Sequence, residues 1–179
     1  RGAGVGGLTG AGAVARRGAQ VTVLEQADAI REVGAGLQIS PNGARVLRAL
    51  GLGDAFETAG PRAEAVELVD GETRGPVARL DLRRLRPDAE YRFLHRARLI
   101  ELLAEGARAA GVQIRLLQQI DRVSLGNHRP RLITVQGAEI ETELLIGADG
   151  LRSEVRQALN GVVAPFFTHQ VAWRALIPC

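Results

Sequence analysis

A glycine-rich run opens the chain in a pattern that could bind phosphate. Gly2, Gly4 and Gly7 occupy the three glycine positions of a GxGxxG sequence. The first glycine of such a pattern permits a tight turn, the second lets the backbone approach a pyrophosphate, and the third lets the following helix pack closely. Because glycine-rich runs also occur in plain flexible loops, the pattern alone is a weak signal of a dinucleotide site.

An acidic residue at the expected distance supports the nucleotide interpretation. Glu25 follows the short apolar run 21–24, which is typical of a buried strand. A carboxylate at a strand end can accept hydrogen bonds from a ribose diol and would repel a 2′-phosphate, so it favours FAD or NAD over NADP. The alternative is a solvated glutamate after a strand. Together with the glycines and a helical spacing between them, Glu25 predicts a dinucleotide site.

A second motif of small residues and an acid lies near the other end of the chain. Residues 147–150, Gly-Ala-Asp-Gly, follow the apolar run 144–146, which predicts a strand that ends at the motif. Asp149 there is most simply a turn residue. The alternative is that its carboxylate orients a ribose hydroxyl near the glycine turn. Ser153 and Arg156 extend the motif to GADGxxSxxR, which is much rarer by chance.

These residues must be positioned by alternating helices and strands. We expect helices within residues 2–18, from Pro41 to about 50, over 95–110 and over 153–159. We expect strands at 21–24, 65–69, 77–82, 112–124, 131–136, 140–146 and 170–176, with the pair at 65–69 and 77–82 antiparallel. Helix–strand alternation at both ends, with a β insertion between, predicts an α/β dinucleotide-binding domain.

Composition excludes several other classes of protein. The 179 residues fit one domain, or one domain with an insertion, and the apolar content of 46% is ordinary for a globular chain. The 23 basic residues are all arginine and are scattered among 20 acids, so we expect no nucleic-acid partner. We also expect no membrane span, a cytoplasmic location, and no metal, because Cys179 is the only cysteine and the histidines show no ligand spacing.

Taken in order, five motifs give the sequence a family likeness. These motifs lie at residues 2–25, 32–42, 94–99, 147–156 and 171–178. With them the sequence resembles the FAD-dependent aromatic-ring monooxygenases of the salicylate hydroxylase and hydroxybenzoate hydroxylase type. The resemblance covers nearly the whole chain but only about the first half of a typical family member. We therefore expect a longer protein, with a strand before Gly2 and a further half beyond Cys179.

The resemblance implies a fold and a set of cofactor contacts. The fold would be a Rossmann-like FAD-binding domain of the glutathione-reductase type, over residues 1–62 and 95–160. An antiparallel β substrate domain would contribute residues 63–94 and 161–179. The implied contacts are Gly2, Gly4, Val5 and Gly7 at the FAD pyrophosphate, Glu25 at the ribose, Arg96 near the phosphate and ribityl chain, Ile120 at the adenine through its backbone, and Asp149 with Gly150 in a motif linked to both FAD and the nicotinamide cofactor.

Gln38 would lie near the flavin ring, where some relatives of this type carry a histidine. If that histidine assists proton removal, a glutamine cannot replace it as a base, because it has no accessible pKa. Arg96 also has a simpler interpretation as an ordinary arginine at a helix start. The family usually has alanine where Gly10 or Gly12 stands.

The resemblance also implies an activity. NADH or NADPH would reduce the flavin, molecular oxygen would add to it, and the resulting flavin hydroperoxide would hydroxylate a small phenolic or benzoate-like substrate. One alternative is a non-catalytic or truncated nucleotide-binding module. Another is a reductase or halogenase of the same fold.

Overall fold

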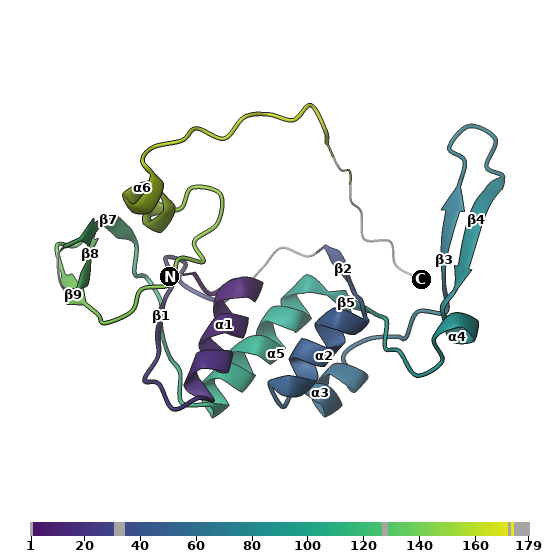
Figure 1. Ribbon diagram of the computed structural model, residues 1–179, viewed down its shortest axis with the longest axis horizontal. Helices are drawn as coiled ribbons and strands as arrows, with labels where there is room; N and C mark the ends of the chain where they lie inside the picture. Colours follow the sequence, from purple (N-terminus) through teal and green to yellow (C-terminus); the bar gives the residue numbers. More distant parts are fainter. Residues whose placement is uncertain (1, 31–34, 127–128, 172, 174–179) are drawn as a thin grey trace.

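Two long helices form the centre of the molecule. The computed structural model describes residues 2–30, 35–126, 129–171 and 173. Helices α1 (Val5–Ala15) and α5 (Arg96–Ala109) pack side by side (Figure 1). Their contact is apolar, because Leu8 from α1 and Leu102 and Leu103 from α5 are almost completely buried in one cluster. This cluster is the main core.

A small parallel pairing lies beside this helical layer. Strand β1 (Thr22–Leu24) pairs in parallel with β6 (Gln113–Arg115), as expected of the αβ connectivity. A three-stranded antiparallel sheet follows along the chain, made of β7 (Ile120–Leu125), β8 (Pro130–Thr134) and β9 (Glu139–Glu141). Leu24, Ile120 and Leu132 form a second apolar cluster that joins this sheet to β1.

The start of α5 adjoins a second group of elements. Strand β2 (Gly36–Ile39) pairs antiparallel with β5 (Arg92–His95), and α5 begins directly after β5. Helix α2 (Pro41–Ala49) begins at the expected proline, and α3 (Gly53–Thr58) packs on it. The sequence analysis predicted α2 but not α3, β2 or β5.

The predicted antiparallel pair projects from this end of the molecule as a ribbon (Figure 1). It consists of β3 (Ala65–Val69) and β4 (Pro76–Asp81), and α4 (Leu82–Leu85) follows it. The pairs Val66–Leu80 and Leu68–Ala78 share one face, while Glu67 and Arg79 form an ion pair on the other. Leu68 and Leu80 are 60% and 49% exposed, so the ribbon has one apolar face that the described residues leave open.

Two strand predictions were wrong in their extent, and a third lies mostly outside the described residues. The single strand expected over 112–124 is two strands, β6 and β7, because the chain bends between them and Leu117 takes a positive φ of 56°. Of the strand expected over 140–146, only the first part forms, as β9 (Glu139–Glu141). The run 144–146 forms no strand, since apolar residues become a strand only where a neighbour supplies a hydrogen-bond ladder. At 170–176, residues 170, 171 and 173 form no strand, and the remainder lies outside the described residues.

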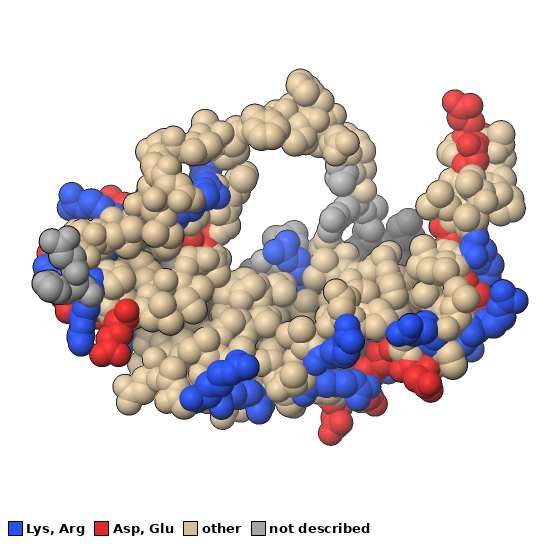
Figure 2. Space-filling model, in the orientation of Figure 1, with Lys and Arg blue, Asp and Glu red and all other residues tan. Residues whose placement is uncertain are grey.

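Charged side chains of both signs mix on the surface. Figure 2 shows basic side chains spread along one edge of this view, interleaved with acidic ones. Among the described residues, no helix has the length and apolar content that crossing a membrane requires.

The most deeply buried aromatic ring gives a test of the core. Phe56 in α3 has no exposed surface, and the Arg92 guanidinium carbon lies 5.8 Å from its ring centroid. We expect Phe56→Ala to lower the free energy of unfolding by about 3–5 kcal/mol, measured by urea denaturation with circular dichroism. The control is Phe166→Ala, where the ring is 85% exposed and the expected change is within about 0.5 kcal/mol. Equal effects of the two substitutions would contradict the placement of the core.

Candidate functional site

The glycine turn lies between the end of β1 and residues 147–149. Gly2 takes a φ of +99°, and its N–H donates to the carbonyl of Leu24 over 2.8 Å. A Cβ on Gly2 would lie 2.3 Å from the carbonyl oxygen of Ala148, and a Cβ on Gly7 would lie 1.8 Å from the carbonyl oxygen of Gly2. The first and third glycines are therefore required by the protein's own backbone.

The middle glycine has a different surrounding. A Cβ on Gly4 would meet nothing within 4 Å, so packing within the protein does not explain a glycine there. Gly4 is the N-cap of α1, which has no side-chain cap and no acidic residue in its first turn. The first amides of a helix lack intrahelical partners and carry the positive end of its dipole. The N-terminus of α1, including Val5, is thus an open, uncapped site suited to an anion.

Glu25 points its carboxylate at the glycine turn. Its Oε2 accepts a hydrogen bond from the backbone N–H of Ala3 over 2.7 Å, and its Oε1 accepts from the N–H of Ala27 over 3.0 Å. The backbone of Glu25 continues the parallel pairing, because its N–H donates to the carbonyl of Arg115 over 2.9 Å. The structure therefore brings Glu25 and the glycine turn together, as the spacing predicted.

Asp149 lies against the turn and also fixes the next helix. A Cβ on Gly2 would come within 3.4 Å of the Asp149 Cα. The carboxylate of Asp149 accepts hydrogen bonds from the Ser153 hydroxyl over 2.5 Å and from the Glu154 N–H over 2.9 Å, at the start of α6 (Glu154–Asn160). Ser153 caps α6 by accepting from the Arg156 N–H over 3.0 Å. The GADGxxSxxR spacing is thus the spacing of a helix cap that holds residues 147–149 in place.

Two glycines of this motif, Gly147 and Gly150, are also required by the local structure. A Cβ on Gly147 would lie 2.7 Å from the Val155 Cβ, so α6 packs directly on the motif. Gly150 takes a φ of +76°, which turns the chain away toward α6.

The other predicted residues lie in different places. Ile120 begins β7 with its side chain buried beside Leu24, one residue before Glu25, so it adjoins the nucleotide end of the site. Gln38 and Arg96 lie in the second group of elements, on β2 and at the start of α5. Arg96 is the first residue of α5, and its N–H donates to the carbonyl of Ala35 over 3.0 Å.

Gln38 has a partner that the sequence analysis did not identify. It is exposed on β2, and its Oε1 accepts a hydrogen bond of 2.8 Å from the hydroxyl of Tyr91. The Tyr91 ring meets Phe93 edge-on, with centroids 6.2 Å apart. Tyr91 is 53 residues from Gln38, so no local spacing could have indicated this contact.

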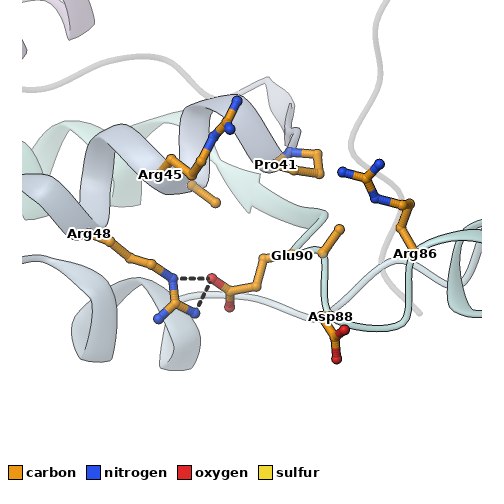
Figure 3. A pocket seen from close by; sticks show the side chains of 8 residues that line it. Pro41, Arg45, Arg48, Arg86, Asp88 and Glu90 are labelled. Carbon is orange, nitrogen blue, oxygen red and sulfur yellow. Dashed lines mark hydrogen bonds and ion pairs between the residues drawn. The ribbon is translucent and has the colours of Figure 1, made fainter.

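A pocket of about 420 Å³ lies elsewhere, between α2 and residues 86–90, and none of the predicted site residues lines it (Figure 3). Arg48 crosses it to contact Glu90, with Nη2 and Oε2 2.5 Å apart, and Arg92 binds the other carboxylate oxygen. Burial raises the pKa of the Glu90 carboxyl, but the hydrogen bonds and charges of Arg48 and Arg92 outweigh burial and lower that pKa below its ordinary value. This network fixes α2 to β5.

Comparison with known proteins identifies the family. The family described as "FAD binding domain" matches residues 2–174, which include the glycine turn, Glu25 and the Asp149 motif. The chain belongs to this FAD-binding domain family. FAD is therefore the cofactor of this family, as the resemblance implied.

Relatives of this FAD-binding domain include aromatic hydroxylases. This chain is 35% identical to 3-hydroxybenzoate 6-hydroxylase 1 of Aquipseudomonas alcaligenes, over 99% of this chain and 46% of the relative. It is 32% identical to 6-hydroxynicotinate 3-monooxygenase of Bordetella bronchiseptica, again over 99% of this chain and 46% of the relative. The chain thus spans about half the length of the curated relatives it matches.

Solved structures share the fold. A crystal structure of 2-methyl-3-hydroxypyridine-5-carboxylic acid oxygenase matches with a TM-score of 0.76 and 29% identity, over 89% of this chain and 40% of that one. A Diels-Alderase of pyrroindomycin biosynthesis matches with the same TM-score and 26% identity, over 88% of this chain and 33% of that one.

The close contact at Gly7 can be tested against a matched glycine of the same helix. We expect Gly7→Ala to weaken FAD binding at least tenfold and to destabilise the fold by about 1–3 kcal/mol, because the new methyl group overlaps the Gly2 carbonyl. Fluorescence titration with FAD and thermal melting measure the two effects.

The control is Gly10→Ala, where a Cβ would meet nothing within 4 Å. It should leave FAD binding unchanged and stabilise α1 by about 0.5–1 kcal/mol. If both variants bind FAD as the parent does, the turn is not formed as described.

The Glu90 network predicts a pH dependence of stability. Because the folded-state pKa of Glu90 lies below its ordinary value of 4.5, the ionised carboxylate stabilises the fold above that pH, and the contribution is lost as the pH falls through the folded-state pKa. At pH 7, Glu90→Gln should lower the free energy of unfolding by about 1–2 kcal/mol. The difference from the parent should shrink below about pH 4. Glu72→Gln, in the exposed β3–β4 turn, should show neither effect.

Proposed function

We propose that the turn at Gly2, Gly4 and Gly7 holds the FAD pyrophosphate, and that this is the nucleotide half of a Rossmann-like domain of the glutathione-reductase type. The proposal rests on the uncapped N-terminus of α1, where Gly4 leaves the backbone open to a ligand, together with the carboxylate of Glu25 beside it. The residues fit the cofactor, since the turn offers amides and carries no acid, while the carboxylate of Glu25 stands beside it.

Each of the candidate site residues has its own proposed role toward the cofactor. The first amides of α1, from Val5 onward, donate to the phosphates, and Glu25 accepts from the adenosine ribose diol. Asp149 and Gly150 shape the loop that closes against the turn. The backbone of Ile120 adjoins the adenine, and Arg96 supplies a positive charge toward the phosphate and ribityl region. Bound FAD supplies the redox chemistry, which the side chains of this domain do not.

We further propose that the protein is a flavin-dependent monooxygenase that hydroxylates a small aromatic acid, with NADH or NADPH as the reductant. The names of its relatives support an aromatic substrate and oxygen as co-substrate. In this assignment Gln38, oriented by Tyr91, faces the flavin ring and donates or accepts hydrogen bonds without acting as a base.

The division into domains follows from the same proposal. Residues 1–62 and 95–160 form the FAD-binding domain, and 63–94 with 161–179 contribute to a β substrate domain. The projecting β3–β4 ribbon supports this division, because its apolar face needs a neighbour that the described residues do not provide.

A second candidate function is another reaction on bound flavin, or nucleotide binding without catalysis. The match to a Diels-Alderase keeps this alternative open, since one fold supports different chemistry.

Purified protein containing this chain should be yellow, with absorbance near ~450 nm, or should become so when FAD is added. An aromatic acid such as a hydroxybenzoate should stimulate NADH or NADPH oxidation and yield a hydroxylated product, detected by mass spectrometry. FAD binding without any stimulated oxidation across a panel of aromatic acids would favour the second candidate. A protein that FAD cannot reconstitute would contradict both.

A further inference from the structure

The backbone amide of Ala3, within the glycine turn, donates to a side-chain carboxylate. Ala3 is only 6% exposed, so its N–H is shielded from water and needs a hydrogen-bond acceptor within the protein. The structure supplies one side-chain acceptor, the Oε2 of Glu25, at 2.7 Å. A carboxylate acceptor makes this bond charge-assisted and about twice as strong as a neutral one.

This bond fixes the position of the whole turn. Ala3 is preceded by Gly2, whose φ of +99° and bond to Leu24 set the direction of the chain. The carbonyl of Gly2 in turn packs against the Cα of Gly7, where no methyl group would fit. A shift of Ala3 would therefore displace the amides at the start of α1 that face the phosphates.

Glu25 can hold the turn and still accept hydrogen bonds from a ribose diol. Each carboxylate oxygen has two lone pairs, and the described contacts use one on each, from Ala3 and from Ala27. A diol can occupy the remaining positions while the turn stays held.

We infer that Glu25 is a positioning residue for the pyrophosphate subsite, in addition to its proposed contact with the ribose. This inference rests on the proposed function of the turn as a dinucleotide site. It requires that loss of the carboxylate weakens binding even of a nucleotide that has no ribose diol.

The experiment compares two ligands, ADP and 2′,3′-dideoxy-ADP, by isothermal titration calorimetry on the FAD-free form of the whole protein that contains this chain. We expect Glu25→Ala to weaken both ligands by about tenfold or more, and Glu25→Gln, which keeps an acceptor oxygen, to restore part of the affinity for the dideoxy ligand. Glu105→Gln, at an exposed position of α5, is the control and should change neither affinity.

Amide exchange of Ala3, followed by NMR in the ligand-free chain, gives an independent readout. Exchange should be slow in the parent and in Glu105→Gln, and should accelerate in Glu25→Ala while the amides of α5 keep their protection. If Glu25→Ala unfolds the protein, Glu25→Gln is compared with the parent instead, by the same nucleotide affinities and the same Ala3 exchange rate.

Loss of affinity for ADP alone, with dideoxy-ADP and Ala3 exchange unchanged, would overturn the inference and leave the proposed function standing. If the parent protein that contains this chain binds neither nucleotide, the proposed function itself is wrong.

Discussion

The site depends on one steric constraint, the close approach of three backbone segments around Gly2. The end of β1, the start of α1 and the 147–149 segment meet there at distances that leave no room for a Cβ on Gly2 or Gly7. Hydrogen bonds from Gly2 to Leu24 and from Ala3 to Glu25 hold the turn on one side. On the other side, the hydrogen bonds of Asp149 and Ser153 at the start of α6 hold residues 147–149 in place. Gly2 and Gly7 therefore act first as packing residues, whereas Gly4, the middle glycine of the motif, faces open space.

Sequence reasoning was most successful where structure is local. Helices α1, α2, α5 and α6 follow from spacing, from proline at the first turn of α2 and from serine at the cap of α6. The pairing of Glu25 with the glycine turn also followed from spacing, because strand, turn and helix lengths fix that geometry. The amide of Ala3 as its partner could not be predicted, since this contact depends on backbone direction across 22 residues.

The failures have a common physical cause. Strands exist only through a neighbour, so the apolar run 144–146 predicted a strand that the described structure does not form, while β2 and β5 went unrecognised. β2 lies within a glycine-containing loop sequence, and its register with β5 pairs Gln38 with Phe93, 55 positions later. The Gln38–Tyr91 contact follows from that register. A single sequence contains no signal for it, whereas the Glu90 network is at least hinted at by the charges at 48, 90 and 92.

The amphipathic β3–β4 ribbon has a consequence for handling the isolated chain. Within the described part of the chain, each strand of the ribbon has one hydrogen-bonded neighbour, so each also presents an outer row of backbone donors and acceptors. An exposed strand edge next to exposed leucines, such as Leu68 and Leu80, is a template for intermolecular β-pairing and self-association. The ion pairs Glu67–Arg79 and Glu64–Arg83 oppose this by keeping charge beside the strands. High ionic strength screens those charges and strengthens apolar association, so low salt and dilution favour a monodisperse preparation.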